Sequence, residues 1–166
     1  PPPPDYQRTQ DLWSVQHSLE QYYSKARSYP IVTQETTAAA RWDALRLTLE
    51  NQLGDKFYIS QDPCQQWQYS YSKDYSSDPT MRSFDYKSSS DGQSYVLMAT
   101  LDHPSKTSYR KFLDYDPDVD GEIHGIWCGE QGRELEYCIV PNEQTLDMRR
   151  RADMSTIAEA MKLYYR

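Results

Sequence analysis

The 166-residue chain lacks several features that define common classes of protein. It has no run near the roughly 20 apolar residues that span a bilayer, and no signal-peptide pattern. It also lacks a surplus of positive charge, because 18 Lys and Arg stand against 25 Asp and Glu. Without surplus cations to displace counterions from phosphates, nucleic acid is not an expected partner. The one basic run, 148–151, is interpreted as a solvated helix start or an interface patch.

Sequence signatures of catalysis are also missing. The chain contains no Gly-x-Ser-x-Gly, His-Glu-x-x-His or P-loop motif. His17, His103 and His124 are scattered along the chain. Nothing near Cys64 supplies the histidine partner that a cysteine nucleophile needs. We therefore expect a protein without enzymatic activity.

Aromatic side chains are abundant, with 15 Tyr and 4 Trp. Such side chains cover a core while they keep a polar edge in water, so we expect a small domain that is aromatic within. Trp67, Tyr69 and Tyr71 alternate with polar residues, which is the period of a strand with one buried face. The same three rings are alternatively an exposed platform for a glycan.

Two helices are predicted near the start of the chain, at 6–26 and 37–53. Each carries apolar side chains at steps of three and four residues, which places them on one face. Gly54 suits the position just past the end of the second helix. The two stripes consist of Leu12, Val15, Leu19, Tyr22 and Ala26 in the first helix, and Trp42, Leu45, Leu49 and Leu53 in the second.

A series of strands is predicted next, at 67–71, 84–86, 94–101, 123–128 and 137–140. Residues 89–93 contain Asp-Gly, the strongest short signal for a hairpin turn. Along 94–101, one set of alternating side chains should face each side of the sheet. Helices followed by strands favour an α+β fold, with a long amphipathic helix packed on an antiparallel sheet. The two sets are Tyr95, Leu97, Ala99 and Leu101 on one face, and Val96 and Met98 on the other.

An extra C-terminal helix is predicted at 147–166, with a sequence that repeats that of the first helix. The two segments align without gaps and share apolar and charged positions, which we interpret as a partial internal repeat. The alternative is that two amphipathic helices share this pattern by chance. The aligned residues are Arg8, Asp11, Leu12, Val15, Leu19, Tyr22 and Tyr23, opposite Arg150, Asp153, Met154, Ile157, Met161, Tyr164 and Tyr165.

Three cysteines are present. Cys128 and Cys138 are close in sequence, and we favour a disulfide between them that closes a short loop. Cys64 would then be free or would pair between chains. The alternative is three reduced, buried thiols.

The order of these motifs resembles type IV pilins and type II secretion pseudopilins. Residues 8–12, 15–23 and 28–30 are similar to the part of the long pilin helix that follows its membrane segment. Residues 42–49 resemble the next helix, and 91–101 resemble the central hairpin. Residues 118–121, followed by Gly125, Cys128 and Cys138, resemble a pilin tail with a terminal disulfide loop. The resemblance covers about residues 8–140.

This resemblance implies a subunit of an extracellular or periplasmic filament, without catalytic activity, that binds like subunits and secretion or pilus machinery. The chain departs from the family in two ways: four prolines stand where a hydrophobic half-helix is expected, and a further helix follows the domain. We expect a Pro-rich leader at 1–5, with Pro1 to Pro4 as stiff polyproline II, a pilin-like domain at 6–146, and the start of a second repeat at 147–166. That last helix alternatively completes a neighbour's fold or packs back on its own sheet. The expected assembly face comprises Leu12, Val15, Leu19, Tyr22, Met154, Ile157, Met161 and Tyr164.

Residues 116–121 read Asp-Pro-Asp-Val-Asp-Gly, a spacing that lets carboxylates converge on calcium. Asp116, Asp118 and Asp120 are the candidate ligands. An EF-hand is excluded, because its twelfth position would be Trp127. An acidic, solvent-exposed turn is the other interpretation. These residues motivate a second functional hypothesis, a secreted calcium-dependent adhesin or carbohydrate-binding module that recognises a surface or glycan.

Overall fold

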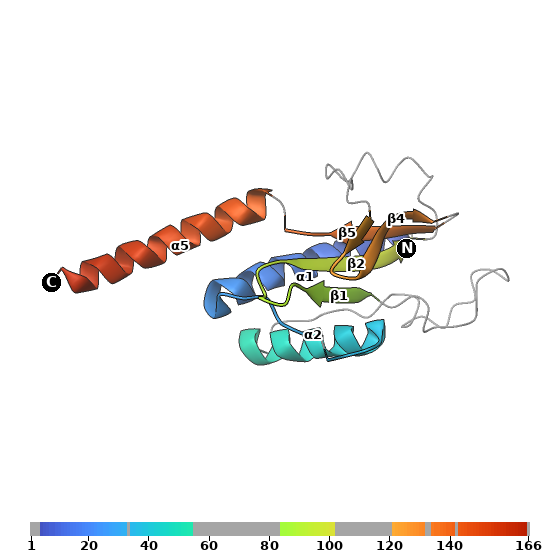
Figure 1. Cartoon of the computed structure of the whole chain (residues 1–166), viewed down its shortest axis with the longest axis horizontal. Helices are drawn as coiled ribbons and strands as arrows, with labels where there is room; N and C mark the ends of the chain where they lie inside the picture. The colour runs from blue at the N-terminus through green and yellow to red at the C-terminus, as the bar shows by residue number, and fades with distance from the viewer. Residues whose placement is uncertain are drawn as a thin grey trace.

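A computed structural model describes residues 4–32, 34–54, 84–101, 121–131, 134–141 and 143–165. The described residues form three helices and a five-stranded antiparallel sheet with the order β1-β2-β5-β4-β3 (Figure 1). This arrangement confirms the α+β class. The elements are α1 (Pro4–Ala26), α2 (Ala38–Leu53), β1 (Asp85–Ser88), β2 (Tyr95–Leu101), β3 (Gly121–Ile123), β4 (Ile126–Gln131), β5 (Glu134–Ile139) and α5 (Glu143–Tyr164).

Helix α1 lies across one face of the sheet, alongside β2 (Figure 1). It begins at Pro4, so the last two residues of the predicted leader are helical. Proline fits there because the first turn of a helix does not use its N–H group. The buried stripe ends at Tyr23, four residues after Leu19, whereas the predicted Tyr22 is half-buried and Ala26 is exposed.

Helix α2 begins one residue after the predicted start and ends, as predicted, at Leu53 before Gly54. The Thr37 hydroxyl oxygen accepts a hydrogen bond from the Ala40 N–H at 3.2 Å, which caps the first turn. Gly54 follows the last turn with φ of 82°, and its N–H donates to the Glu50 carbonyl at 2.8 Å. Trp42, Leu45 and Leu49 are buried, so α2 and α1 cover the same core.

Strand β2 separates two apolar cores, as its alternation predicted. Tyr95, Leu97, Ala99 and Leu101 belong to the main core beneath α1 and α2. Val96 points to the opposite face, where it packs with Met98 and with side chains of β3, β4 and β5. The hairpin β3–β4 therefore covers part of the second face of the sheet.

The predicted single strand at 123–128 is wrong, because the chain reverses at His124 and Gly125. Both residues have positive φ, 49° and 80°, and Ile123 pairs with Ile126 across the turn. Two residues with positive φ match the twist of a tight hairpin. The segment therefore contributes two strands, β3 and β4, and β5 begins at Glu134, three residues before the predicted start.

The turn predicted at 89–93 is confirmed, and it packs on the chain segment that follows α1. The Tyr29 N–H donates to the Gly92 carbonyl at 2.7 Å. Gly92 has φ of 66°, and a Cβ atom there would lie 3.0 Å from the Ser28 Cβ. Glycine is required at this position both by its backbone conformation and by this close approach.

Helix α5 extends away from the sheet, and its free end is far from the other elements (Figure 1). It starts at Glu143, four residues earlier than predicted. The side chains that the structure describes in this helix are exposed, so they do not pack back on the sheet of their own chain. None of the described helices is long and apolar enough to cross a membrane.

Candidate assembly face and its supporting core

The exposed apolar stripe of α5 is the candidate functional site. Its members are Met154, Ile157, Met161 and Tyr164, which we call the α5 face. Their exposed fractions are 66%, 52%, 53% and 84%. The steps of three, four and three residues place them along one side of the helix. Leu163, 75% exposed, lies off this stripe.

The corresponding residues of α1 are not available for assembly, which corrects the prediction for that helix. Leu12, Val15 and Leu19 are almost completely buried in the main core. They hold α1 to the sheet and to α2 within the same chain. Tyr22 is half-buried and packs against the same core.

Polar side chains of α1 reinforce this contact with the sheet. The Gln16 amide donates to the Tyr95 hydroxyl at 3.1 Å, and the Trp13 indole N–H donates to the Tyr137 hydroxyl at 3.3 Å. The Glu20 carboxylate accepts from the Tyr29 hydroxyl at 2.8 Å and from the Tyr95 hydroxyl at 3.3 Å. Gln16 and Glu20 are half-buried, and their side chains satisfy these hydroxyl groups.

The main core contains a cluster of tyrosine rings, in agreement with the aromatic interior expected from composition. Ring centroids lie 4.9 Å apart for Tyr23 and Tyr29, and 4.5 Å apart for Tyr29 and Tyr95. The Tyr86 hydroxyl donates to the Pro30 carbonyl at 2.8 Å. Burial raises the pKa of Tyr86 and Tyr95, and the nearby Glu20 carboxylate raises that of Tyr95 further. These phenols therefore stay neutral and act as hydrogen-bond donors.

A buried ion pair joins α2 to β1 and was not predicted. The Arg41 guanidinium donates to both Asp85 carboxylate oxygens at 2.7 Å, and also to the carbonyls of Glu35 and Thr36. The hydrogen bonds to Asp85 raise the pKa of Arg41, against the opposing effect of burial. One signal was present in the sequence: Arg41 precedes Leu45 by four residues and therefore shares its buried face.

A second buried ion pair lies at the start of α1. Arg8 is 0% exposed, and its guanidinium donates to the Asp5 carboxylate at 2.8 Å. The sequence indicated Arg8 through its alignment with Arg150 and through the motif at 8–12, but it did not indicate the pairing with Asp5. A fully buried arginine is rare unless it is paired, so this contact belongs to the packed body of the protein.

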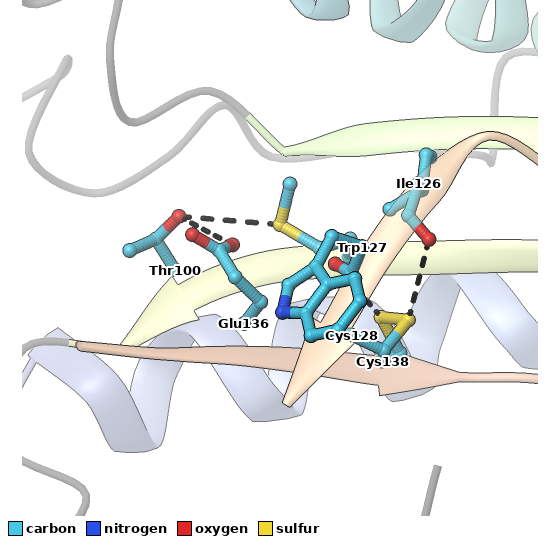
Figure 2. Close-up of a disulfide and its surroundings, with 7 residues drawn as sticks. Thr100, Ile126, Trp127, Cys128, Glu136 and Cys138 are labelled. Atoms are coloured by element: carbon cyan, nitrogen blue, oxygen red, sulfur yellow. Dashed lines mark hydrogen bonds between the residues drawn. A yellow bond between two sulfur atoms is a disulfide. The ribbon is translucent and has the colours of Figure 1, made fainter. Parts of the chain in front are cut away.

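The predicted disulfide between Cys128 and Cys138 is present, with Cα atoms 5.8 Å apart (Figure 2). Strand β4 pairs with β5 only from Gly129 to Gln131, and from Ile126 to Cys128 it pairs with β3. The bond therefore ties β4 to β5 where their hydrogen-bonded ladder ends. Nearby, the Thr100 hydroxyl donates to the Glu136 carboxylate at 2.9 Å and links β2 to β5 (Figure 2).

Several predicted site residues lie outside the part of the chain that the structure describes. They are the calcium candidates Asp116, Asp118 and Asp120, together with Cys64, His103 and the aromatic residues at 67–71. Within the described residues, no group of three or more His, Cys, Asp or Glu side chains is arranged to hold a metal ion. His17 and His124 are exposed. The calcium site and the glycan platform stay predictions.

The described structure thus separates a packed body from one exposed helix face. The body comprises α1, α2 and the sheet, tied by the Cys128–Cys138 bond. The α5 face does not pack in either of the apolar cores of that body. No protein-family model matches the chain, and neither a curated protein nor a solved structure matches it.

Proposed function

We propose that this protein is a structural subunit, without catalytic activity, of an extracellular type IV pilus-like or pseudopilus filament. Its contacts with other subunits would run through the α5 face. The observation that carries the proposal is the exposure of Met154, Ile157, Met161 and Tyr164 on one side of a helix that leaves the body. Contiguous exposed apolar side chains of this kind mark sites of interaction.

The architecture supports the pilin-like part of the proposal. A 23-residue helix lies on an antiparallel sheet, and a disulfide closes the hairpin near the last strand. The described motifs that resemble pilins, at 8–12, 15–23, 28–30, 42–49 and 91–101 and at Gly125, Cys128 and Cys138, lie in this body. Because one fold hosts many functions, the proposed role draws on the α5 face as well as on the fold.

The disulfide supports the proposed location outside the cytoplasm. Structural disulfides form and persist in oxidising compartments such as the periplasm and the cell surface. Cys128 is buried and Cys138 is nearly so, which protects the bond from reductants once it has formed. A subunit exposed on a filament would benefit from a tether that keeps β4 on β5.

The experiment that tests the proposal is sedimentation velocity of the whole chain over a range of concentrations. We expect the protein to form larger species as its concentration rises. The double variant Ile157→Asp, Met161→Asp should stay monomeric, because charged groups in an apolar contact are not solvated. Leu163→Asp is the matched control, and it should still associate because Leu163 lies off the α5 face.

Two outcomes would contradict the proposal. One is a chain that stays monomeric at every concentration. The other is association that the double variant and the control lose to the same extent, since the contact would then not depend on the α5 face.

A further inference from the structure

Helices α1 and α5 match at more positions than the apolar stripe alone. At the same offset that aligns Arg8 with Arg150, Asp5 aligns with Asp147. In α1, Asp5 and Arg8 form the buried ion pair at the start of the helix. The sequence of α5 therefore repeats both the charged pair and the apolar stripe that dock α1 on its sheet.

The matched positions have opposite environments in the two helices. Leu12, Val15 and Leu19 have exposed fractions of 0%, 2% and 0%. Their counterparts Met154, Ile157 and Met161 are more than half exposed. Tyr23 is buried against Tyr29, whereas its counterpart Tyr165 is exposed. Thus α5 carries the face of a sheet-covering helix, but the described part of the chain supplies no sheet for it.

We infer that the α5 face is built to cover an antiparallel sheet of the same kind as the one beneath α1, carried by a second domain of this fold. The inference rests on the proposed function, because it names the partner of the proposed assembly face. Its basis is the set of contacts that α1 makes here, since those contacts show what accepts a helix with this arrangement of side chains.

The sheet of this same chain is not the partner, for two reasons. Its helix position is already filled by α1. In addition, the polar side chains that α1 uses differ in α5: Trp13, Gln16 and Glu20 align with Ser155, Ala158 and Lys162. Ser155 and Ala158 are too short to replace the hydrogen bonds that Trp13 and Gln16 make to tyrosine hydroxyls.

The difference at Glu20 indicates how the second sheet should differ from this one. Glu20 accepts hydrogen bonds from two tyrosine hydroxyls of the core. Lys162 can only donate. A sheet that fits α5 therefore presents an acceptor opposite Lys162, such as a carboxylate or a carbonyl oxygen.

A helix graft in the whole chain tests the inference. Residues 4–24 are replaced by residues 146–166, which keeps the register of the alignment, and Thr9 is retained because it is buried and aligns with the exposed Arg151. We expect this chain to fold and to show a cooperative thermal transition at a lower Tm than the native protein. Changing the grafted Lys162→Glu should raise that Tm, because an acceptor for Tyr29 and Tyr95 is restored.

The control graft inserts residues 145–165 at the same place, again with Thr9 retained. A shift of one residue rotates every side chain by about 100° around the helix axis. Asp153 and Thr156 then occupy the core positions of Leu12 and Val15, so we expect no cooperative transition. Equal Tm values for the two grafts would overturn the inference. So would failure of the in-register graft to fold in both its forms, with and without Lys162→Glu.

This experiment separates the inference from the proposed function. The grafts report on fit within one chain and do not require self-association. If the in-register graft fails to fold but the native chain associates, the second sheet is excluded as the partner and the α5 face is still a contact. If the in-register graft folds but the native chain never associates, the filament role is contradicted. The inferred chemistry of the partner sheet is then still supported.

Discussion

Helices α1 and α5 share a pattern of side chains but have opposite surroundings. In α1 the stripe is buried against Tyr95, Leu97 and other residues of the core, whereas in α5 the same stripe is exposed. The comparison shows that helical periodicity identifies a face that needs a partner, but does not identify the partner. Three of the four predicted assembly residues of α1 were wrong for this reason, because their partner is the sheet of their own chain.

The largest difference in stability between the two helices is expected from one matched pair of substitutions, Leu19→Asp in α1 and Met161→Asp in α5. Leu19 is completely buried, so Leu19→Asp removes an apolar side chain from the core. It also places a carboxylate where water cannot solvate it. We expect the free energy of unfolding to fall by at least about 4 kcal/mol. Met161→Asp in the monomer should change it by less than about 0.5 kcal/mol, because the site is exposed.

Urea denaturation at low protein concentration, followed by tyrosine and tryptophan fluorescence, measures both values. Met161→Ala serves as a control for loss of the side chain without added charge. Similar losses of stability for Leu19→Asp and Met161→Asp would show that α5 is packed on the body, contrary to the structure.

Reduction of the disulfide is expected to have an intermediate effect on stability, which the body shows and α5 does not. The bond closes a loop with a sequence separation of 10, and constraint of such a loop in the unfolded chain contributes about 3 kcal/mol. We expect a reductant, or the double variant Cys128→Ala, Cys138→Ala, to lower the urea midpoint of the body. Amide hydrogen exchange along α5 should not change, because α5 makes no described contact with the bond. An unchanged urea midpoint would contradict a stabilising role for this disulfide.

The smallest effect is expected at acid pH, in the turn that packs beside the end of α1. The Asp91 carboxylate accepts from the Ser89 hydroxyl at 2.6 Å and from the Gln93 N–H at 3.0 Å, and these hydrogen bonds lower its pKa. A lowered pKa means that the contribution of Asp91 is complete above its ordinary value, near 3.8, and is lost as the pH falls through the folded-state value.

We therefore expect Asp91→Asn to reduce slightly the loss of stability between pH 5 and pH 3. Ser89→Ala should do the same, since it removes the strongest of these hydrogen bonds. Urea midpoints at several pH values provide the measurement. An unaltered pH dependence in both variants would show that the Ser89–Asp91 contact does not persist in solution.

Local features of the fold could be predicted because each depends on neighbouring residues. Thr37 and Gly54 mark the ends of α2, Asp91 and Gly92 mark a turn, and the alternation along β2 separates two cores. The Cys128–Cys138 pairing was also accessible from the sequence, because the two residues are close along the chain.

Features that depend on distant residues were missed. The ion pair between Arg41 and Asp85 joins residues that are 44 positions apart, and helical period alone shows only that Arg41 shares a face with Leu45. The hydrogen bond between Gln16 and Tyr95 spans 79 positions. The turn at His124 and Gly125 is local, and it was missed because a positive φ is uncommon for any residue other than glycine, which left Gly125 as the one signal of a turn.

The length of α5 has a mechanical consequence for any assembly that it joins. A helix of 22 residues, at about 1.5 Å per residue, is a stiff spacer about 33 Å long. The distance between the body and a domain docked near Tyr164 is then set by residue number, and so is their relative rotation. Inserting two residues ahead of Met154 would lengthen the spacer by about 3 Å and turn the far domain by about 200°. Inserting a whole number of turns would change the spacing and largely preserve the orientation.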